Sequence, residues 1–401
     1  MSTADFKVPT PAGSRIESIT TTDYFDLTSA PTCSLLSLPL GFPSTLKTAQ
    51  VWSPSEFADE ASFVINLTLE NKHELDSALQ AFKSLCLDGN LVDRKNFPLP
   101  KLGPTLDGIA DDVHNGKGFC VLRGLETDRY CVEDGMIVFL GIQSYIAERR
   151  MRQDEVGNML VHVTADPSNE RLSKHVRHST SNIVCHKSRH QGKNADRLKP
   201  FHTDPDADVL AFQTRDVAAS GGRCVLASGH SIYNELARTR PDVISTLASA
   251  DWPFALPYFY QRPILFHHNS RVIFCFTRLA LVGNEFYPRP TSIPSITPRQ
   301  KEALDILNSI AEKDRLEICL QPGDMYFVNN LALLHRRDEF VDDEEHTRHL
   351  VRMHLRNEEL GWDIPDELKR FWDEALDEER EESWHIEPMP ESFFPLKLGS
   401  H

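Results

Sequence analysis

Residues 201–212 read FHTDPDADVLAF, a histidine and an aspartate two positions apart with an apolar run close behind. Alternate residues of a strand point to the same side, so His202 and Asp204 at the start of a strand would present an imidazole and a carboxylate together. This arrangement suits chelation. The stretch therefore predicts two ligands of a metal site at the edge of a β-structure.

The pair alone is weak evidence, because 17 His and 59 acidic residues in 401 should give roughly two or three His-x-acid pairs by chance. Two occur, and the second is His385/Glu387. It lies in an acidic tail, no strand follows it, and only His401 lies downstream. We interpret His385 as a solvated histidine and retain the first pair.

A third ligand has to come from far along the chain, and His335 follows the predicted strand pair LEICLQPGDMYFVNNLALLH, in which Pro-Gly-Asp signals a turn. Two imidazoles and one carboxylate on one face leave three positions of an iron(II) ion open for cosubstrate and oxygen. A histidine that ends an apolar strand is more often structural than ligating. The segment after His335 decides between these interpretations.

Thirteen residues later comes RHLVRMHLR, in which Arg348, Leu350 and Arg352 would share one face of a strand. Buried arginines are costly unless an anion receives them, so one of them would take the distal carboxylate of a dicarboxylate ligand. Salt bridges to the acidic segment 342–345 or to the tail are the alternative. A zinc hydrolase built from His346, His349 and His354 lacks the H-E-x-x-H pattern, and we expect a strand to split these histidines between its faces.

The rest of the chain predicts an α+β protein built on an antiparallel barrel. Helical spacing is present in ENKHELDSALQAFKSL, PTLDGIADDVHNG, SIYNELART, PDVISTLAS and TPRQKEALDILNSIAEKD. Short apolar runs predict strands at GKGFCVLRGL, DVLAFQTRD, GGRCVLASG, LEICLQ, DMYFVNN and RHLVRMHLR, and a strand pair, RPILFHH and RVIFCFT, around Asn269 and Ser270.

Charge and composition limit the classes of partner. The formal net charge is -16, and residues 358–387 carry 13 acidic and 3 basic residues, so most of the acidity belongs to the tail. This balance argues against nucleic acid. No apolar stretch is long enough to span a membrane and the first residues lack a secretory signal, so we expect a soluble, cytoplasmic protein. The eight cysteines are dispersed without a C-x-x-C pair, and we expect buried thiols.

Several segments, in consistent order over residues 96–356, resemble the taurine dioxygenase and clavaminate synthase-like (TauD/TfdA) superfamily, particularly its fungal members. They are NFPLPKLGPTL, GKGFCVLRGL, FHTD, SGGRCVLASGHSIYNEL, FVNNLALLHRR and TRHLVRMHLR. The resemblance implies a double-stranded β-helix (jelly roll, cupin-like) with flanking and inserted helices in residues 96–357. An N-terminal arm and helical flank (1–95) would precede it, and an acidic C-terminal helical tail (358–401) would follow.

The resemblance also implies an Fe(II)- and 2-oxoglutarate-dependent dioxygenase that uses O2 and releases succinate and CO2. His202, Asp204 and His335 would hold the iron. Arg348 would bind the distal carboxylate of 2-oxoglutarate, and Arg352 would be the second arginine, near the iron-bound end. The family often has Thr or Ser after the Gly-Gly turn to help hold that carboxylate, whereas this chain has Cys224, a weak hydrogen-bond donor.

The substrate is less well defined. The loop 185–200 carries five basic residues against one acidic residue and is either a solvated loop or a lid for an anion, with Lys199 as a candidate contact. Asn329 and Asn330 would stabilise a turn or touch substrate. We expect a small, carboxylate-bearing, amino-acid-like molecule. The alternatives are oxidative cyclisation, such as aziridine formation from an amino acid in fungal secondary metabolism, and a non-catalytic 2-oxoglutarate sensor; the oligomeric state stays open.

Overall fold

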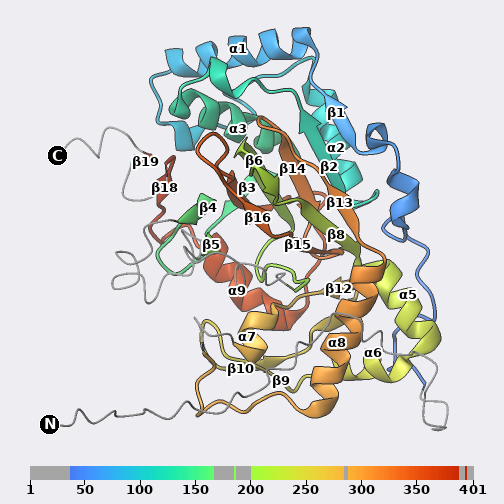
Figure 1. Cartoon of the computed structure of the whole chain (residues 1–401). Coiled ribbons are helices and arrows are strands. Elements are labelled where there is room, and N and C mark those ends of the chain that lie inside the picture. Colours follow the sequence, from blue (N-terminus) through green and yellow to red (C-terminus); the bar gives the residue numbers. More distant parts are fainter. Residues whose placement is uncertain (1–36, 167–184, 187–199, 284–287, 388–392, 395–401) are drawn as a thin grey trace, which may run out of the picture. The chain divides into compact units, whose positions relative to one another are not determined.

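The fold is taken from a computed structural model, which describes residues 37–166, 185–186, 200–283, 288–387 and 393–394 (Figure 1). These residues belong to one compact unit that begins at Ser37. The segment 187–199, which includes Lys199, lies outside the described residues. The basic loop and its candidate contact therefore stay predictions.

Two β-sheets form the centre. The larger sheet has eight strands and its order is β1 (Val64–Asn66), β2 (Phe119–Arg123), β14 (Met325–Asn329), β6 (Val209–Asp216), β17 (His349–Arg356), β4 (Val161–Asp166) and β5 (Cys185–His186), with β3 (Arg149–Met151) beside β17. The smaller sheet is β13 (Leu316–Ile318), β8 (Cys224–Ser228) and β15 (Leu333–Arg337). Strands that are distant in sequence are thus neighbours in both sheets.

Four two-stranded sheets complete the β-structure of the described residues. They are β9 (Trp252–Phe254) with β10 (Tyr260–Arg262), β11 (Leu265–His268) with β12 (Arg271–Phe274), β7 (Ser220–Gly221) with β16 (Phe340–Val341), and β18 (Trp384–His385) with β19 (Phe393–Phe394). Asn269 and Ser270, the predicted turn between β11 and β12, have φ of 44° and 62°. These left-handed values are those of a tight hairpin turn, so this predicted hairpin is confirmed.

Helices cover both sheets. The helices α1 (Leu69–Ser84), α2 (Gly103–His114) and α3 (Val132–Ile146) pack in one core with the larger sheet, and α5 (Gly229–Thr239), α6 (Pro241–Leu247) and α8 (Pro298–Lys313) pack in another with the smaller sheet (Figure 1). Also present are α7 (Arg278–Val282), α9 (Asp366–Leu376) and the 3-10 helices η1 (Pro54–Phe57), η2 (Glu60–Ser62), η3 (Gly89–Leu91) and η4 (Thr127–Arg129). The α+β jelly-roll fold is as predicted.

Residue parity decides which side chains face the space between the sheets. In β14, Met325 and Phe327 pack toward the helices, whereas Tyr326 and Val328 join a cluster that also contains residues of the smaller sheet such as Leu226. In β15, Leu334 faces the outer helices and Leu333 faces the interior. The positions that alternate with the outward-facing residues therefore line the interior of the sandwich.

The predicted helices are all present, and two of them begin at capping residues. Thr68 and Thr297 cap α1 and α8 as capping boxes, and a proline follows Thr297 at the first helical position. Helix α3 gave no signal in the sequence, because Met136–Ile146 is buried on all sides and has no polar face.

Two expectations about the strands around His335 were wrong. The segments LEICLQ and DMYFVNN do not pair with each other: β13 pairs with β8, and β14 pairs with β2 and β6. The Pro-Gly-Asp turn instead carries the chain from one sheet to the other. His335 does not end a strand but lies in the middle of β15, because the chain turns at residues 330–332 and starts a new strand.

Two expectations about individual residues also need correction. Cys120 and Cys275 are buried as expected, but Cys86, Cys131 and Cys319 are exposed, so their short apolar surroundings did not predict burial. His385 is half-buried in β18, and its carbonyl oxygen lies 2.7 Å from Nε2 of His162, so it is not a solvated residue.

Described residues on both sides of 96–357 pack on the core. Strand β1 pairs in parallel with β2, and α9 buries Leu368, Trp372 and Ala375 in the cluster between the sheets. The boundaries at 95 and 357 stay predictions. Among the described residues, no helix is long and apolar enough to cross a membrane.

Candidate metal centre

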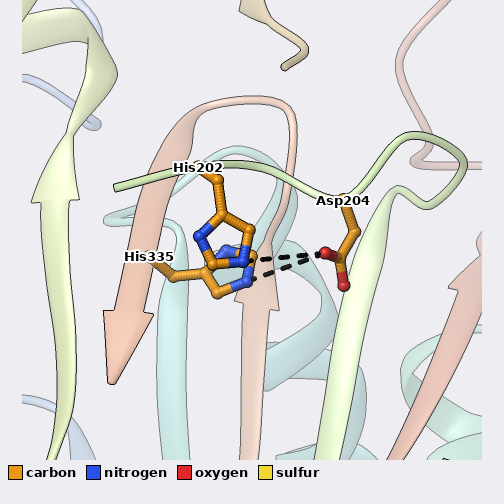
Figure 2. A group of neighbouring side chains, drawn as sticks. All are labelled: His202, Asp204 and His335. Atoms are coloured by element: carbon orange, nitrogen blue, oxygen red, sulfur yellow. Dashed lines mark ion pairs between the residues drawn. The ribbon is translucent and has the colours of Figure 1, made fainter. Parts of the chain in front are cut away.

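The side chains of the three predicted ligands point toward one another (Figure 2). His202 and His335 exchange two backbone hydrogen bonds, of 3.1 and 2.9 Å, and their ring centroids are 4.3 Å apart. Oδ1 of Asp204 lies 3.9 Å from Nε2 of His202 and 4.0 Å from Nε2 of His335. Residues separated by more than 130 positions are thus brought together by the pairing of a loop with β15.

The donor set fits an iron(II) ion. One ligand atom from each residue lies within 4.8 Å of the others. Adjacent ligands on an octahedron with bonds of about 2.1 Å are roughly 3 Å apart, so closure around an ion needs shifts of only about 1 Å. Nδ1 of His202 lies 3.1 Å from the carbonyl oxygen of Pro200 and donates to it when neutral, which leaves Nε2 to bind a metal.

Burial and neighbouring charges set the protonation states of His335 and Asp204. Burial, followed by the neighbouring His202, lowers the pKa of His335 to about 3, so this imidazole is neutral. Burial alone would raise the pKa of Asp204, but the Arg352 guanidinium and the hydrogen bond from His354 outweigh it and hold that pKa well below its usual range. Neutral imidazoles and an ionised carboxylate are the forms that bind a divalent cation.

The two oxygens of Asp204 have different surroundings. Oδ1 faces the histidines, whereas Oδ2 accepts hydrogen bonds from Nη1 of Arg352 at 2.8 Å and Nε2 of His354 at 3.1 Å. Nε of Arg352 donates to Oε1 of Gln153 at 2.8 Å, which fixes the guanidinium. The carboxylate is thereby oriented so that one oxygen is directed toward the histidines.

His354 has a role that sequence reasoning missed. Besides Asp204, it contacts Asp206, with Nδ1 3.2 Å from Oδ1, and although burial opposes its charge, these two carboxylates raise its pKa. We expected a strand to split the late histidines between its faces, and His349 and His354, an odd number of positions apart in β17, lie on opposite faces. His354 lies two residues after Arg352 and therefore on the same face of β17.

Arg348 lies apart from the metal ligands, next to the Gly-Gly turn. Its Nε donates to the carbonyl oxygen of Gly222 at 3.1 Å, and its guanidinium lies 5.5 Å from the centre of the Phe340 ring. A Cβ on Gly222, whose φ is +72°, would meet Cδ of Arg348 at 2.9 Å, so only glycine allows this approach. A cavity of about 430 Å³ beside Arg348 is lined by Thr214, the 217–223 segment, Cys319, Leu320 and Leu350, and by no metal ligand.

The two asparagines before His335 bond to the backbone. Asn330 accepts a hydrogen bond from the backbone N–H of Asp204 at 2.8 Å and donates to the carbonyl oxygens of Asp204 and Ala207. Asn329 donates to the carbonyl of Val113 and accepts from two N–H groups of the following turn. Both side chains are buried: Asn330 holds the loop that carries Asp204, and Asn329 holds the turn before β15. Substrate contact by either one stays a prediction.

Comparison with known proteins decides the family. The model of the taurine catabolism dioxygenase TauD, TfdA family matches residues 81–354. The chain belongs to this family. The taurine hydroxylase-like protein SAT17 of Stachybotrys chartarum is 35% identical over 357 residues, which cover 86% of this chain and 89% of SAT17. The FR-33289 synthase of Streptomyces rubellomurinus is 24% identical and covers 79% of this chain and 92% of that protein.

Solved structures show the same fold at low identity. An asparagine oxygenase in complex with Fe(II), 3-hydroxyasparagine and succinate has a TM-score of 0.54 at 14% identity, covering 75% of this chain and 98% of that one. The non-haem iron oxygenase OrfP, in complex with Fe, has a TM-score of 0.51 at 13% identity, covering 74% and 94%. As a member of the TauD, TfdA family, the protein is an Fe(II)- and 2-oxoglutarate-dependent dioxygenase, and the predicted enzyme class and cofactors are confirmed.

Proposed function

We propose that His202, Asp204 and His335 hold the iron, that Arg348 binds the distal carboxylate of 2-oxoglutarate, and that the enzyme oxidises a small amino-acid-like substrate. The observation that carries this proposal is the convergence of two imidazoles and one carboxylate, with the carboxylate oriented by Arg352 and His354. Such a donor set suits iron(II) and leaves positions open for cosubstrate and oxygen.

Iron and 2-oxoglutarate, when bound, supply O2 activation coupled to decarboxylation, which yields succinate, CO2 and an oxidised substrate. The chain itself supplies orientation and charge. Arg352 and His354 compensate the charge of Asp204 and direct Oδ1 to the metal. Arg348, fixed by the carbonyl of Gly222, offers a guanidinium to a carboxylate that arrives between the sheets.

The names of relatives support the substrate class. The asparagine oxygenase is described with a hydroxylated asparagine, OrfP is described with hydroxylated L-arginine, and SAT17 is called taurine hydroxylase-like. All three names refer to small molecules that carry both an amine and an acidic group. The basic sequence of residues 185–200, directly before His202, suits a substrate with a negative group. We therefore propose an α-amino acid or an aminosulfonate.

The test starts without oxygen. The metal-free protein is given Fe(II) and 2-oxoglutarate, and we expect the charge-transfer absorption of the chelated cosubstrate. A panel of amino acids and aminosulfonates is then screened under O2 for substrate-stimulated succinate release and for product mass. A gain of one oxygen atom indicates hydroxylation, whereas a loss of two hydrogens indicates cyclisation or desaturation.

A matched pair of variants links the activity to the site. His335→Ala should lose the absorption band and turnover, whereas His346→Ala, which removes an exposed histidine eleven positions later, should retain both. Retention of iron binding and turnover by His335→Ala would show that the third ligand is wrong. The absence of both the band and any stimulated succinate release in the wild type would refute the proposed function.

A further inference from the structure

Cys224 leaves the proposed distal-carboxylate site without the hydroxyl that the family often supplies there. The residue lies at the start of β8 after the Gly221–Gly222 turn, and its side chain points toward the interior of the sandwich. Burial raises the pKa of its thiol despite the nearby guanidiniums of Arg348 and Arg337. A protonated thiol is a weak donor, so other groups would have to complete a site for a carboxylate.

Tyr326 provides a hydroxyl in this region. It lies in β14 with its side chain in the cluster between the sheets, and it is 2% exposed. Burial, with a further contribution from the neighbouring Cys224, raises its pKa well above the usual value, so the phenol keeps its proton. Among the described residues, its hydroxyl has no hydrogen-bond partner. A buried O–H donor without an acceptor is costly, unless an acceptor arrives with a ligand.

Arg337 provides a second cation. It pairs directly across from Cys224 in the β8–β15 ladder, and it lies two residues after His335, on the same face of β15. Its Nη1 is buried and, within the described part of the chain, has no hydrogen-bond partner. The adjacent Asp338 is engaged by Arg223 and Arg336, and no ion pair joins Arg337 to a described carboxylate.

The two arginines converge on one aromatic ring. The guanidinium carbon of Arg337 lies 4.7 Å from the centre of the Phe340 ring, and that of Arg348 lies 5.5 Å from it. Although burial outweighs them, both guanidiniums act to lower the pKa of the Cys224 thiol, Arg348 more than Arg337. Phe340, Cys224 and the two arginines therefore lie around one region at the end of β15, and Tyr326 packs in the same cluster between the sheets as Cys224.

The spacing along β15 suits the proposed cosubstrate. Two residues of a strand advance by about 6.7 Å, so this region lies roughly that far from the ligand His335. The two carboxyl carbons of 2-oxoglutarate are joined by four bonds of about 1.5 Å, so an extended molecule spans roughly 5 Å between them. A cosubstrate chelated at the metal would place its distal carboxylate near Arg337.

We propose that the Tyr326 hydroxyl and the Arg337 guanidinium bind the distal carboxylate of 2-oxoglutarate together with Arg348, in place of the hydroxyl that Cys224 lacks. The inference rests on the proposed function, which puts that carboxylate at Arg348. It assigns a recognition role to two side chains that come from different sheets. It also gives the Tyr326 hydroxyl and Nη1 of Arg337 a hydrogen-bond acceptor.

The experiment compares two cosubstrates. Wild type, Tyr326→Phe and Arg337→Gln are titrated anaerobically, in the presence of Fe(II), with 2-oxoglutarate and with 2-oxopentanoate, which has a methyl group in place of the distal carboxylate. Each variant should bind 2-oxoglutarate about 10- to 100-fold more weakly, because a hydrogen bond to a charged group is lost. Affinity for 2-oxopentanoate should stay within about twofold of wild type.

A rescue variant and controls make the assignment specific. Cys224→Thr in the Tyr326→Phe background should restore most of the lost affinity, because it returns a hydroxyl to the region. Tyr258→Phe, which removes another buried hydroxyl without a described partner, and Arg315→Gln, which removes a surface cation, should bind both compounds like wild type. Tyr326→Phe removes a single oxygen atom, so we expect it to fold.

The possible failures are distinguishable. If wild type gives a normal 2-oxoglutarate titration but Tyr326→Phe and Arg337→Gln match it, the assignment is wrong while the proposed function stands. Equal weakening for both cosubstrates would show a structural role and overturn the assignment as well. If wild type itself binds no 2-oxoglutarate, the proposed function fails, and the inference fails with it.

Discussion

Replacing His354 by leucine should weaken metal binding although His354 is not a ligand. In the wild type its ring lies between two carboxylates, 3.1 Å from Oδ2 of Asp204 and 3.2 Å from Oδ1 of Asp206, and its side chain is 2% exposed. The variant removes one charge-assisted hydrogen bond from Asp204 and leaves Arg352 as its remaining cation. The loss of such a bond costs about 1.5–3 kcal/mol, or about 10- to 100-fold in metal affinity.

The assay titrates metal-free protein with Co(II) and follows its visible absorption, which reports the metal site without turnover. The matched control is His346→Leu, because His346 and Asp343 form a similar pair at 3.0 Å with side chains 47% and 52% exposed. An exposed pair contributes little, so this control should bind Co(II) like wild type. If His354→Leu binds Co(II) within about threefold of wild type, His354 does not orient Asp204 and the reasoning is refuted.

Two further predictions concern the Gly-Gly turn and a buried histidine pair. Gly222→Ala should raise the KM for 2-oxoglutarate about tenfold, because the new Cβ would lie 2.9 Å from Cδ of Arg348 at a φ of +72°. Gly108→Ala is the control: its new Cβ would meet no atom within 4 Å, so the KM should not change. His162 and His349, joined at 2.9 Å, have pKa values lowered to about 3, chiefly by burial. Below pH 6.5 these two histidines take up protons in the unfolded chain but not in the folded protein. The free energy of unfolding, measured with urea, should therefore be lower at pH 5.5 than at pH 7.5 by about 1.4 kcal/mol per histidine. His349→Gln should reduce this difference.

The sequence predicted most of the helices and strands, and it named the three side chains that the structure brings together as a candidate metal site, because local patterns carry this information. The helical spacing of residues 70–85 and 297–314 belongs to α1 and α8 as predicted, whereas His202 and Asp204 lie in a loop before β6 and not at the start of that strand. Helix α3 was not predicted, because residues that are buried on all sides leave no polar face and therefore no helical period in the sequence. The pairing of β13 and β14 was wrong because a turn signal marks where the chain bends and not which strand it joins next.

The residues around the ligands were harder to find, because their partners are set by strand register. His354 could have been identified in part, because counting by two along RHLVRMHLR places it on the same face of the strand as Arg352.

Tyr326 could not be identified in this way. In the sequence it is an aromatic residue between Met325 and Phe327, and aromatic residues are common in buried strands. Its hydroxyl becomes notable only when β14 of one sheet faces β8 and β15 of the other and no described residue accepts its proton. A polar atom without a described partner in the packed interior is a property of the three-dimensional fold, and for this reason the proposed role of Tyr326 in binding the distal carboxylate could be inferred only from the structure.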